Sequence, residues 1–420
     1  MGNYIFTLVL IWLVFPVPAM AQETPSNNDP PSVHFGNWLT LNPRTRIQLD
    51  LRSFQPELDD QTKIFRGRSA RFGVDGTLFR DIGYMVRTET TTGPVLRDFF
   101  FVYQRFRPLQ VQAGRFKIPF GLDQLTDSSE LDFVQRSRLG SIVAPGRDTG
   151  AMIFGQLEQG KIQYSAGAFR HDGRNSEIED FASTEEFLPG GNRTLAARVS
   201  IQPLELLSVS TPIHDLTFSA AFTHGDLVTG LSSMHGATVS NQVFFPRVYA
   251  SGARTRRGAE WSGTLGSLAI KGEFMDVREQ RLGQGLNGEN LPALRTQGWF
   301  LSAVQPVFGS IKNTNRGGFL RSILPGAQRG LLEATARYEV IRFGSESSDG
   351  TAASPSRSPR AANVVGNDDR AWTFGLNWHA SRYMKFQLNG IRETLRDPLR
   401  TPVDGKTRYW TTVARLQLNF

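Results

Sequence analysis

The chain has 420 residues, no cysteine and a net charge of +8 at pH 7, from 47 basic and 39 acidic side chains. Without cysteine it can form neither a disulfide framework nor a thiolate metal site. Apolar residues make up only 39% of the chain while aromatic residues reach 11%, with 41 glycines, and this composition favours a sheet protein. Forty of the basic residues are arginines. Because arginine binds oxyanions through paired hydrogen bonds, an anionic partner is the first hypothesis to test.

The chain opens with an apolar run from Ile5 to Val17, which ends in the small-residue motif Pro18-Ala19-Met20-Ala21. The run is too short to span a bilayer comfortably, and the motif is typical of a cleavage site for export. No Lys or Arg precedes the run, so a membrane anchor is the alternative interpretation. We predict a signal peptide over 1–21 and a disordered polar lead-in over 22–40.

The segment 41–420 is predicted to be all-β, because apolar and polar residues alternate with a period of two. In its last part Trp410, Leu416 and Phe420 share one face, while Arg415 and Gln417 share the other. The same pattern predicts sixteen strands, near 44–52, 65–79, 83–90, 95–105, 108–116, 149–158, 161–170, 193–202, 214–223, 256–264, 267–277, 297–304, 331–341, 371–379, 383–392 and 406–420.

Short turns alternate with long connections along this segment, such as 117–148, 171–192, 224–255 and 342–370. The second face carries too many charges to be buried without water, so it is expected to line a wet lumen while the apolar face contacts lipid. We therefore predict a 16-stranded antiparallel transmembrane β-barrel with short periplasmic turns and long extracellular loops. The connection 305–330 is long where the alternation predicts a short turn.

Four stretches in the first third are the most distinctive: Ser69–Gly76, Ala113–Leu122 (AGRFKIPFGL), Leu125–Ser129 (LTDSS) and Phe133–Ser137. Together they resemble the phosphate-selective porin O/P family. The resemblance implies a homotrimer of barrels in the bacterial outer membrane, surrounded by lipid and lipopolysaccharide. It also implies that each pore passes small anions, namely chloride and, by preference, phosphate or polyphosphate.

Candidate residues for the anion pathway follow from the charged face and from the long connection 117–148. Hydroxyl and guanidinium groups are suitable donors for replacing the water around an oxyanion. The connection also contains five acidic residues, so its charge alone does not make it an anion trap. The candidates from the connection and the wall are Lys117, Ser128, Ser129, Arg136, Arg138, Arg71, Arg87, Arg198, Arg337 and Arg415.

A second group of candidates lies in the segment 242–257, which contains Arg247, Arg254, Arg256 and Arg257 and no acid. If the fifth long loop enters the pore, as the resemblance suggests, these arginines would form a mouth that concentrates anions. The alternative is that they lie outside the barrel and pair with lipopolysaccharide or with neighbouring loops.

Other classes of function have little support. The six histidines show no hydrolase-like arrangement with a serine and an acid, and no H-E-x-x-H motif is present, so we expect no enzyme, no metal site and no cofactor. No nucleic-acid-binding motif accompanies the basic charge. A structural or adhesive barrel and a non-selective general porin remain the alternatives to an anion porin.

Overall fold

The computed structural model describes the chain from residue 32 onward, with gaps. The described residues are 32–56, 65–91, 93, 95–173, 193–209, 211–309, 311–313, 321–323, 330–346, 356–381, 383–397, 401–403 and 405–420. The predicted signal peptide and residues 22–31 of the predicted lead-in lie outside them.

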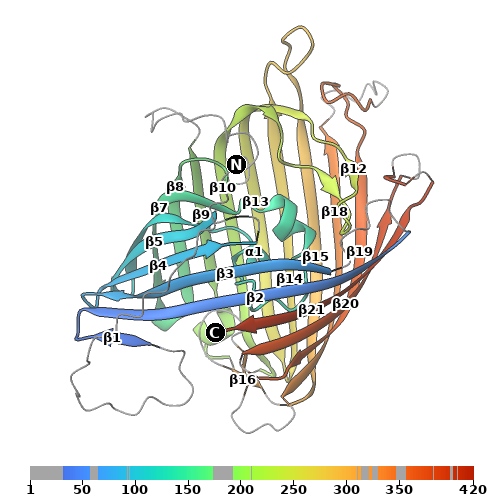
Figure 1. The fold of residues 1–420 in the computed structure, drawn as a ribbon. Coiled ribbons are helices and arrows are strands. Elements are labelled where there is room, and N and C mark those ends of the chain that lie inside the picture. Colours follow the sequence, from blue (N-terminus) through green and yellow to red (C-terminus); the bar gives the residue numbers. More distant parts are fainter. Residues whose placement is uncertain are drawn as a thin grey trace, which may run out of the picture.

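The described residues form a closed barrel of sixteen antiparallel strands (Figure 1). Each strand pairs with the next along the chain, and β2 closes the ring by pairing with β21. The sixteen strands are β2 (Leu39–Gln55), β3 (Phe65–Leu78), β4 (Ile82–Glu89), β5 (Val95–Phe106), β6 (Leu109–Lys117), β7 (Arg147–Leu157), β8 (Ile162–Phe169), β9 (Thr194–Ile201), β10 (Ile213–Leu231), β13 (Tyr249–Leu265), β14 (Leu268–Arg281), β15 (Leu291–Phe308), β18 (Leu331–Ser345), β19 (Asn367–His379), β20 (Met384–Leu395) and β21 (Arg408–Asn419).

All sixteen predicted strands are present, so the predicted fold class is confirmed. Several strands extend farther toward the long connections than expected; β10 continues to Leu231 and β13 already begins at Tyr249. The assignment of 224–255 to a loop is therefore wrong at both ends. Within the predicted disordered lead-in, the short strand β1 (Val33–Phe35) pairs with the start of β2, so disorder is the wrong expectation for these residues.

The two faces of the strands have the predicted character. Apolar residues such as Phe374 and Leu388 point outward and are 58% and 48% exposed, as expected of side chains that contact lipid. Charged residues such as Asp50 and Arg415 point inward. They are buried rather than exposed to a wide channel, because chain segments fold into the lumen and cover them.

Two long connections fill much of the lumen. The inner loop, residues 118–146, contains the helices α1 (Leu122–Leu125) and η1 (Leu139–Val143), and Figure 1 shows α1 inside the ring of strands. The plug loop, residues 232–248, contains β11 (Gly236–Ala237) and β12 (Val243–Phe245). Phe120, Met234 and Phe343 belong to one apolar cluster that joins the two loops to the barrel wall.

The remaining elements lie in the other connections. The 3-10 helix η2 (Glu158–Gly160) joins β7 to β8, and α2 (Pro203–Leu206) joins β9 to β10. The connection after β15, which the sequence did not explain, contains a small hairpin of β16 (Ile311–Asn313) and β17 (Arg321–Ile323). Among the described residues, no helix combines the length and the apolar character that a membrane crossing requires.

Candidate functional site

The inner loop is fixed to the barrel wall on the side of β18 to β21. Lys385 donates from Nζ to the carbonyl of Leu131 at 2.6 Å. Asn389 accepts from the backbone N–H of Val134 at 2.7 Å, and Arg415 donates to the carbonyl of the same residue at 2.7 Å. These buried side chains satisfy backbone groups that have no partner in secondary structure, and they hold the loop across the lumen.

The start of the inner loop is fixed to β14, which is separated from β18 by β15 alone in the barrel wall. The carboxylate of Glu273 accepts from the N–H groups of Leu122, at 2.8 Å, and Asp123, at 3.5 Å, which are the first two residues of α1. Gly121 precedes the helix with a φ of 85°, and a Cβ there would lie 2.7 Å from Met275. The position therefore requires glycine for its backbone angle and for space.

Between the inner loop and the wall formed by β2, β3 and β4 lies a recess of about 470 Å³. It extends toward the end of the barrel that carries the short turns, where Tyr383 and Phe420 line it. The residues that line the recess are Arg44, Thr45, Arg46, Arg71, Asp75, Met85, Arg87, Asp127, Ser129, Glu130, Tyr383, Asn419 and Phe420.

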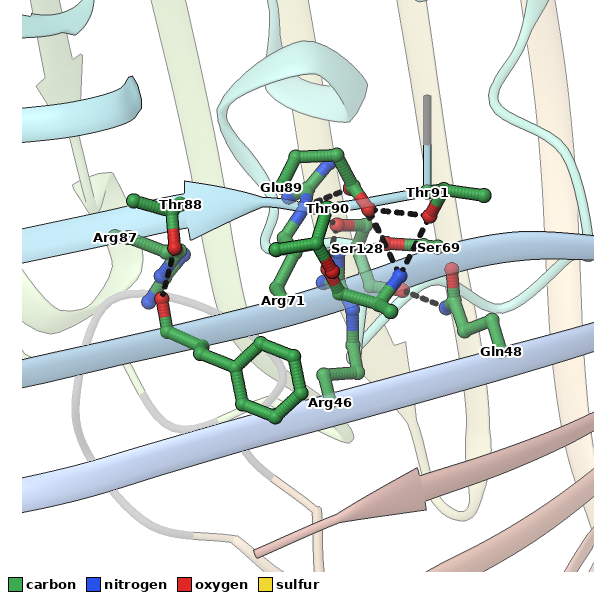
Figure 2. Close-up of polar contacts among 12 residues, drawn as sticks. Arg46, Gln48, Ser69, Arg71, Arg87, Thr88, Glu89, Thr90, Thr91 and Ser128 are labelled. Carbon is green, nitrogen blue, oxygen red and sulfur yellow. Dashed lines mark hydrogen bonds and ion pairs between the residues drawn. The ribbon is translucent and has the colours of Figure 1, made fainter. Parts of the chain in front are cut away.

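The arginines of the recess are brought together by the strand register. Arg46 lies directly opposite Arg71 in the ladder between β2 and β3. Like charges in this position destabilise a sheet unless other groups neutralise them. In Figure 2, both guanidinium groups reach the hydroxyl of Ser128; Arg71 donates to it at 3.2 Å, and Arg46 also donates to it. Arg71 further donates to Glu89 at 2.7 Å.

Asp127 supplies a carboxylate of the inner loop to the same arginines. It pairs with Arg87 at 2.9 Å and with Arg46 at 3.1 Å. Burial by itself would raise the pKa of Asp127, but Arg87 and Arg46 together hold that pKa below its ordinary value. Asp127 therefore stays ionised and occupies the centre of the arginine group.

Glu130 lies at the exposed edge of the recess and behaves in the opposite way. Desolvation by the neighbouring protein atoms of the recess, followed by the charge of Asp127, raises the pKa of Glu130 above its ordinary value, although its side chain is partly exposed and Lys117 and Lys385 oppose the shift. The recess thus contains one carboxylate that remains charged and another that takes up a proton more readily than usual.

The structure brings Arg71, Arg87, Ser128 and Ser129 together around the recess, as the sequence analysis proposed for an anion pathway. Ser129 donates from its N–H and hydroxyl groups to Asp127, at 2.9 and 2.8 Å.

The other candidates from the connection 117–148, including Lys117 at the end of β6, stabilise the backbone of the inner loop instead. Lys117 donates to the carbonyl groups of residues 125 and 126 at 3.0 and 2.9 Å. Arg136 donates to the carbonyl of Thr126 at 2.8 Å and to that of Asp123. Arg138 is buried and pairs with Glu393. None of the three lines the recess.

The remaining wall candidates are paired within the barrel. Arg198 pairs with Glu260 at 2.6 Å. Arg415 pairs with Asp50 at 2.6 Å. A third wall candidate, Arg337, donates to backbone carbonyls of the inner loop. These residues point into the lumen as predicted, but neighbouring carboxylates or carbonyl groups occupy their donors.

The predicted anion-collecting mouth takes a different form. The plug loop does enter the barrel, and it holds Arg247, which is half-buried. Arg254 and Arg256 instead lie in β13, are 1% and 0% exposed, and both pair with Asp172. Arg254 also pairs with Glu279. Although 242–257 contains no acid, other parts of the chain supply carboxylates to its arginines, so these two do not form an open mouth.

Four residues that line the recess are not among those predicted for the pathway: Arg44, Arg46, Asp127 and Glu130. The inward position of Arg46 could have been predicted from strand alternation, because Arg46 shares the inward face of β2 with Asp50. For the two acids, no local pattern could show that the inner loop would place them against the arginines of β2 and β4.

The comparisons agree with this architecture. The model of the family "phosphate-selective porin O and P" matches residues 42–420. Among solved structures, OmpT of Vibrio cholerae is similar, with a TM-score of 0.56 and 9% identity over 92% of this chain and 100% of that one. The outer-membrane channel DcaP of Acinetobacter baumannii has a TM-score of 0.54 and 11% identity, over 91% and 98%. OmpF of Salmonella typhi, in complex with daunomycin, has a TM-score of 0.52 and 9% identity, over 93% of this chain and 100% of that one. No curated protein matches the chain in sequence.

Proposed function

Because the chain belongs to the phosphate-selective porin O and P family, we propose that it is an anion-preferring porin whose recess binds phosphate or polyphosphate in passage. The protein is a porin of the bacterial outer membrane and not an enzyme. Chloride is the second anion that the proposal includes.

The observation that carries the proposal is the direct opposition of Arg46 and Arg71 beside the hydroxyl of Ser128. Arginine and hydroxyl donors can replace the water around an oxyanion, and arginine does so with two parallel hydrogen bonds. A wall that places like charges side by side gains stability from any anion that enters between them. The recess is also large enough for an inorganic phosphate.

The proposal also accounts for release. Conduction requires sites that bind an ion weakly enough to let it leave. Asp127 already neutralises part of the charge of Arg46 and Arg87, so an incoming anion competes with a tethered carboxylate. The competition weakens binding and favours exchange over retention.

We further propose that the protein forms a homotrimer, in which each barrel has its own pore. A similar solved structure, OmpT of Vibrio cholerae, has been determined in a trimer form, which supports this assembly.

Single-channel recording in a planar bilayer tests the proposed function. A KCl gradient should give a zero-current potential with the sign of anion preference, and added phosphate should reduce the chloride current. The double variant Arg46→Gln/Arg71→Gln should weaken the phosphate block by roughly tenfold, because it removes charge-assisted hydrogen bonds. Arg105→Gln/Arg107→Gln, which removes two exposed arginines near a short turn, should leave both measurements unchanged.

Three outcomes would contradict the proposal. Cation preference would exclude an anion porin, and equal permeability with no phosphate block would indicate a non-selective general porin. A barrel that shows no discrete conductance steps would have a structural or adhesive role.

A further inference from the structure

A row of arginines lies on the outer face of the barrel, apart from the recess. Six consecutive strands, from β14 to β21, each carry one outward-facing arginine near the end with the long connections. Their neighbours along each strand point inward and are mostly buried, so these arginines face outward. We call the set the arginine girdle: Arg278, Arg295, Arg342, Arg370, Arg392 and Arg408.

The strand register makes the girdle continuous. Arg278 lies directly opposite Arg295 in the ladder between β14 and β15. Each further member lies two residues along its strand from the residue that pairs with the previous member. For example, Arg342 pairs with Asp368, and Arg370 lies two residues after Asp368. Such neighbours in a sheet are about 5 to 8 Å apart. The girdle is therefore a band of positive charge and not a set of scattered residues.

The girdle keeps much of its charge available to solvent or to a partner. The side chains of Arg278, Arg295 and Arg342 are 60%, 48% and 52% exposed, although each has a carboxylate within 3.6 Å. Arg370 and Arg408 are also exposed, and no described residue forms an ion pair with either of them.

Aromatic side chains lie directly on the membrane side of the girdle. Trp372 and Trp410 follow Arg370 and Arg408 by two residues, and Tyr338 lies four residues from Arg342. At the usual strand rise these separations are about 7 and 13 Å. The rings of Tyr338 and Trp372 are 4.6 Å apart, and together they form part of an aromatic belt. Such a belt marks the level of the lipid head groups.

We propose that the arginine girdle binds the phosphate groups of the phosphorylated glycolipid (lipid A) in the outer leaflet. The girdle lies at head-group level at the extracellular end, where the long connections are, and its arginines match phosphate in charge and in hydrogen-bonding geometry. A basic cluster next to the apolar region recruits anionic lipid in the same way. The glycolipid would form a layer along the six strands of the girdle and exclude other lipids from this part of the barrel surface.

Native mass spectrometry of the full-length protein in detergent tests this proposal, with bisphosphorylated lipid A as the probe. The triple variant Arg342→Gln/Arg370→Gln/Arg408→Gln should bind lipid A at least roughly tenfold more weakly than wild type, since each basic residue near a charged lipid surface contributes to binding. The matched control is Arg80→Gln/Arg105→Gln/Arg107→Gln, which removes three exposed arginines at the opposite end of the barrel. The control should bind lipid A as wild type does.

Dephosphorylated lipid A provides a test that needs no variant, because wild type should bind it much more weakly than the bisphosphorylated form. The proposal fails if the two forms bind wild type equally, if the girdle variant keeps full affinity, or if the control loses as much affinity as the girdle variant. It also fails if the girdle variant changes only the oligomeric state, since the face would then lie between protomers.

Discussion

Asp127 illustrates how one carboxylate can position an arginine group and limit its charge. It contacts Arg46 and Arg87 from the inner loop, while Ser128 receives hydrogen bonds from Arg46 and Arg71. The same two residues of the loop therefore bring an acceptor and a negative charge to the wall. Without them, Arg71 would keep its ion pair with Glu89 and Arg87 its ion pair with Asp98, but Arg46 would lose its carboxylate partner in the loop.

Glu130 predicts a pH dependence of the pore. Its pKa is raised by desolvation and by Asp127, so Glu130 loses its charge at a higher pH than an ordinary glutamate. Asp127 stays ionised over that range because its pKa is lowered. As the pH falls from neutral to mildly acidic, the recess becomes more positive, and the anion preference should rise.

Zero-current potentials at a series of pH values would measure this effect. In the variant Glu130→Gln, the anion preference should already be high at neutral pH, and most of the pH dependence of the zero-current potential should disappear. If wild type and variant show the same profile, the effect comes from another group.

Residue roles could be predicted only where strand alternation determines them. The alternation of polar and apolar residues along the strands correctly placed Arg71 and Arg415 on the inward face. It could not show that Arg254 pairs with Asp172, 82 residues earlier, or that Arg415 pairs with Asp50, 365 residues earlier. Whether an inward arginine remains available to an anion depends on such distant partners.

At the scale of elements, the inner loop depends on the wall for its position. Lys385 and Gln387 both donate to the carbonyl of Leu131. The variant Lys385→Met removes a charge-assisted hydrogen bond worth about 1.5–3 kcal/mol. The loop should then move more freely, which should increase open-channel current noise and make 118–146 more susceptible to proteolysis.

Lys406→Met is the matched control, because Lys406 is exposed and lies in the connection between β20 and β21. It should leave both the noise and the cleavage pattern unchanged. Equal noise in the two variants would show that the Lys385 contact does not restrain the loop.

The strand ends were harder to predict than the strands, for a physical reason. Near the long connections some inward residues are apolar because they pack in the apolar cluster that includes the plug loop, while outward residues such as Arg278 and Arg342 are charged. Val277 and Phe343 point inward and are buried in the apolar cluster. Alternation between polar and apolar residues therefore fades in β14 and β18, although the ladder of hydrogen bonds continues.

For the whole molecule, the apolar outer face predicts the effect of a misplaced charge. Phe374 and Leu388 face outward on β19 and β20, in the middle part of their strands. Replacing either residue with arginine should reduce the free energy of unfolding by about 2–4 kcal/mol if the site lies near the bilayer midplane. Reversible unfolding in lipid vesicles measures this loss.

The control variant Phe374→Ile keeps the site apolar and should cost much less. Normal stability of both arginine variants would contradict the assignment of this face to lipid.

The junction of β2 and β21 has a consequence for assembly. Asp50 lies directly opposite Arg415 at this junction, and the two side chains form a buried ion pair. A slip of one residue would turn apolar side chains inward. A slip of two residues would preserve the faces but would set Arg415 against Arg52 or Gln48, and the carboxylate would lose its direct partner. The ion pair thus favours a single alignment of the two strands that join the ends of the sheet, and it destabilises a barrel that is joined out of register.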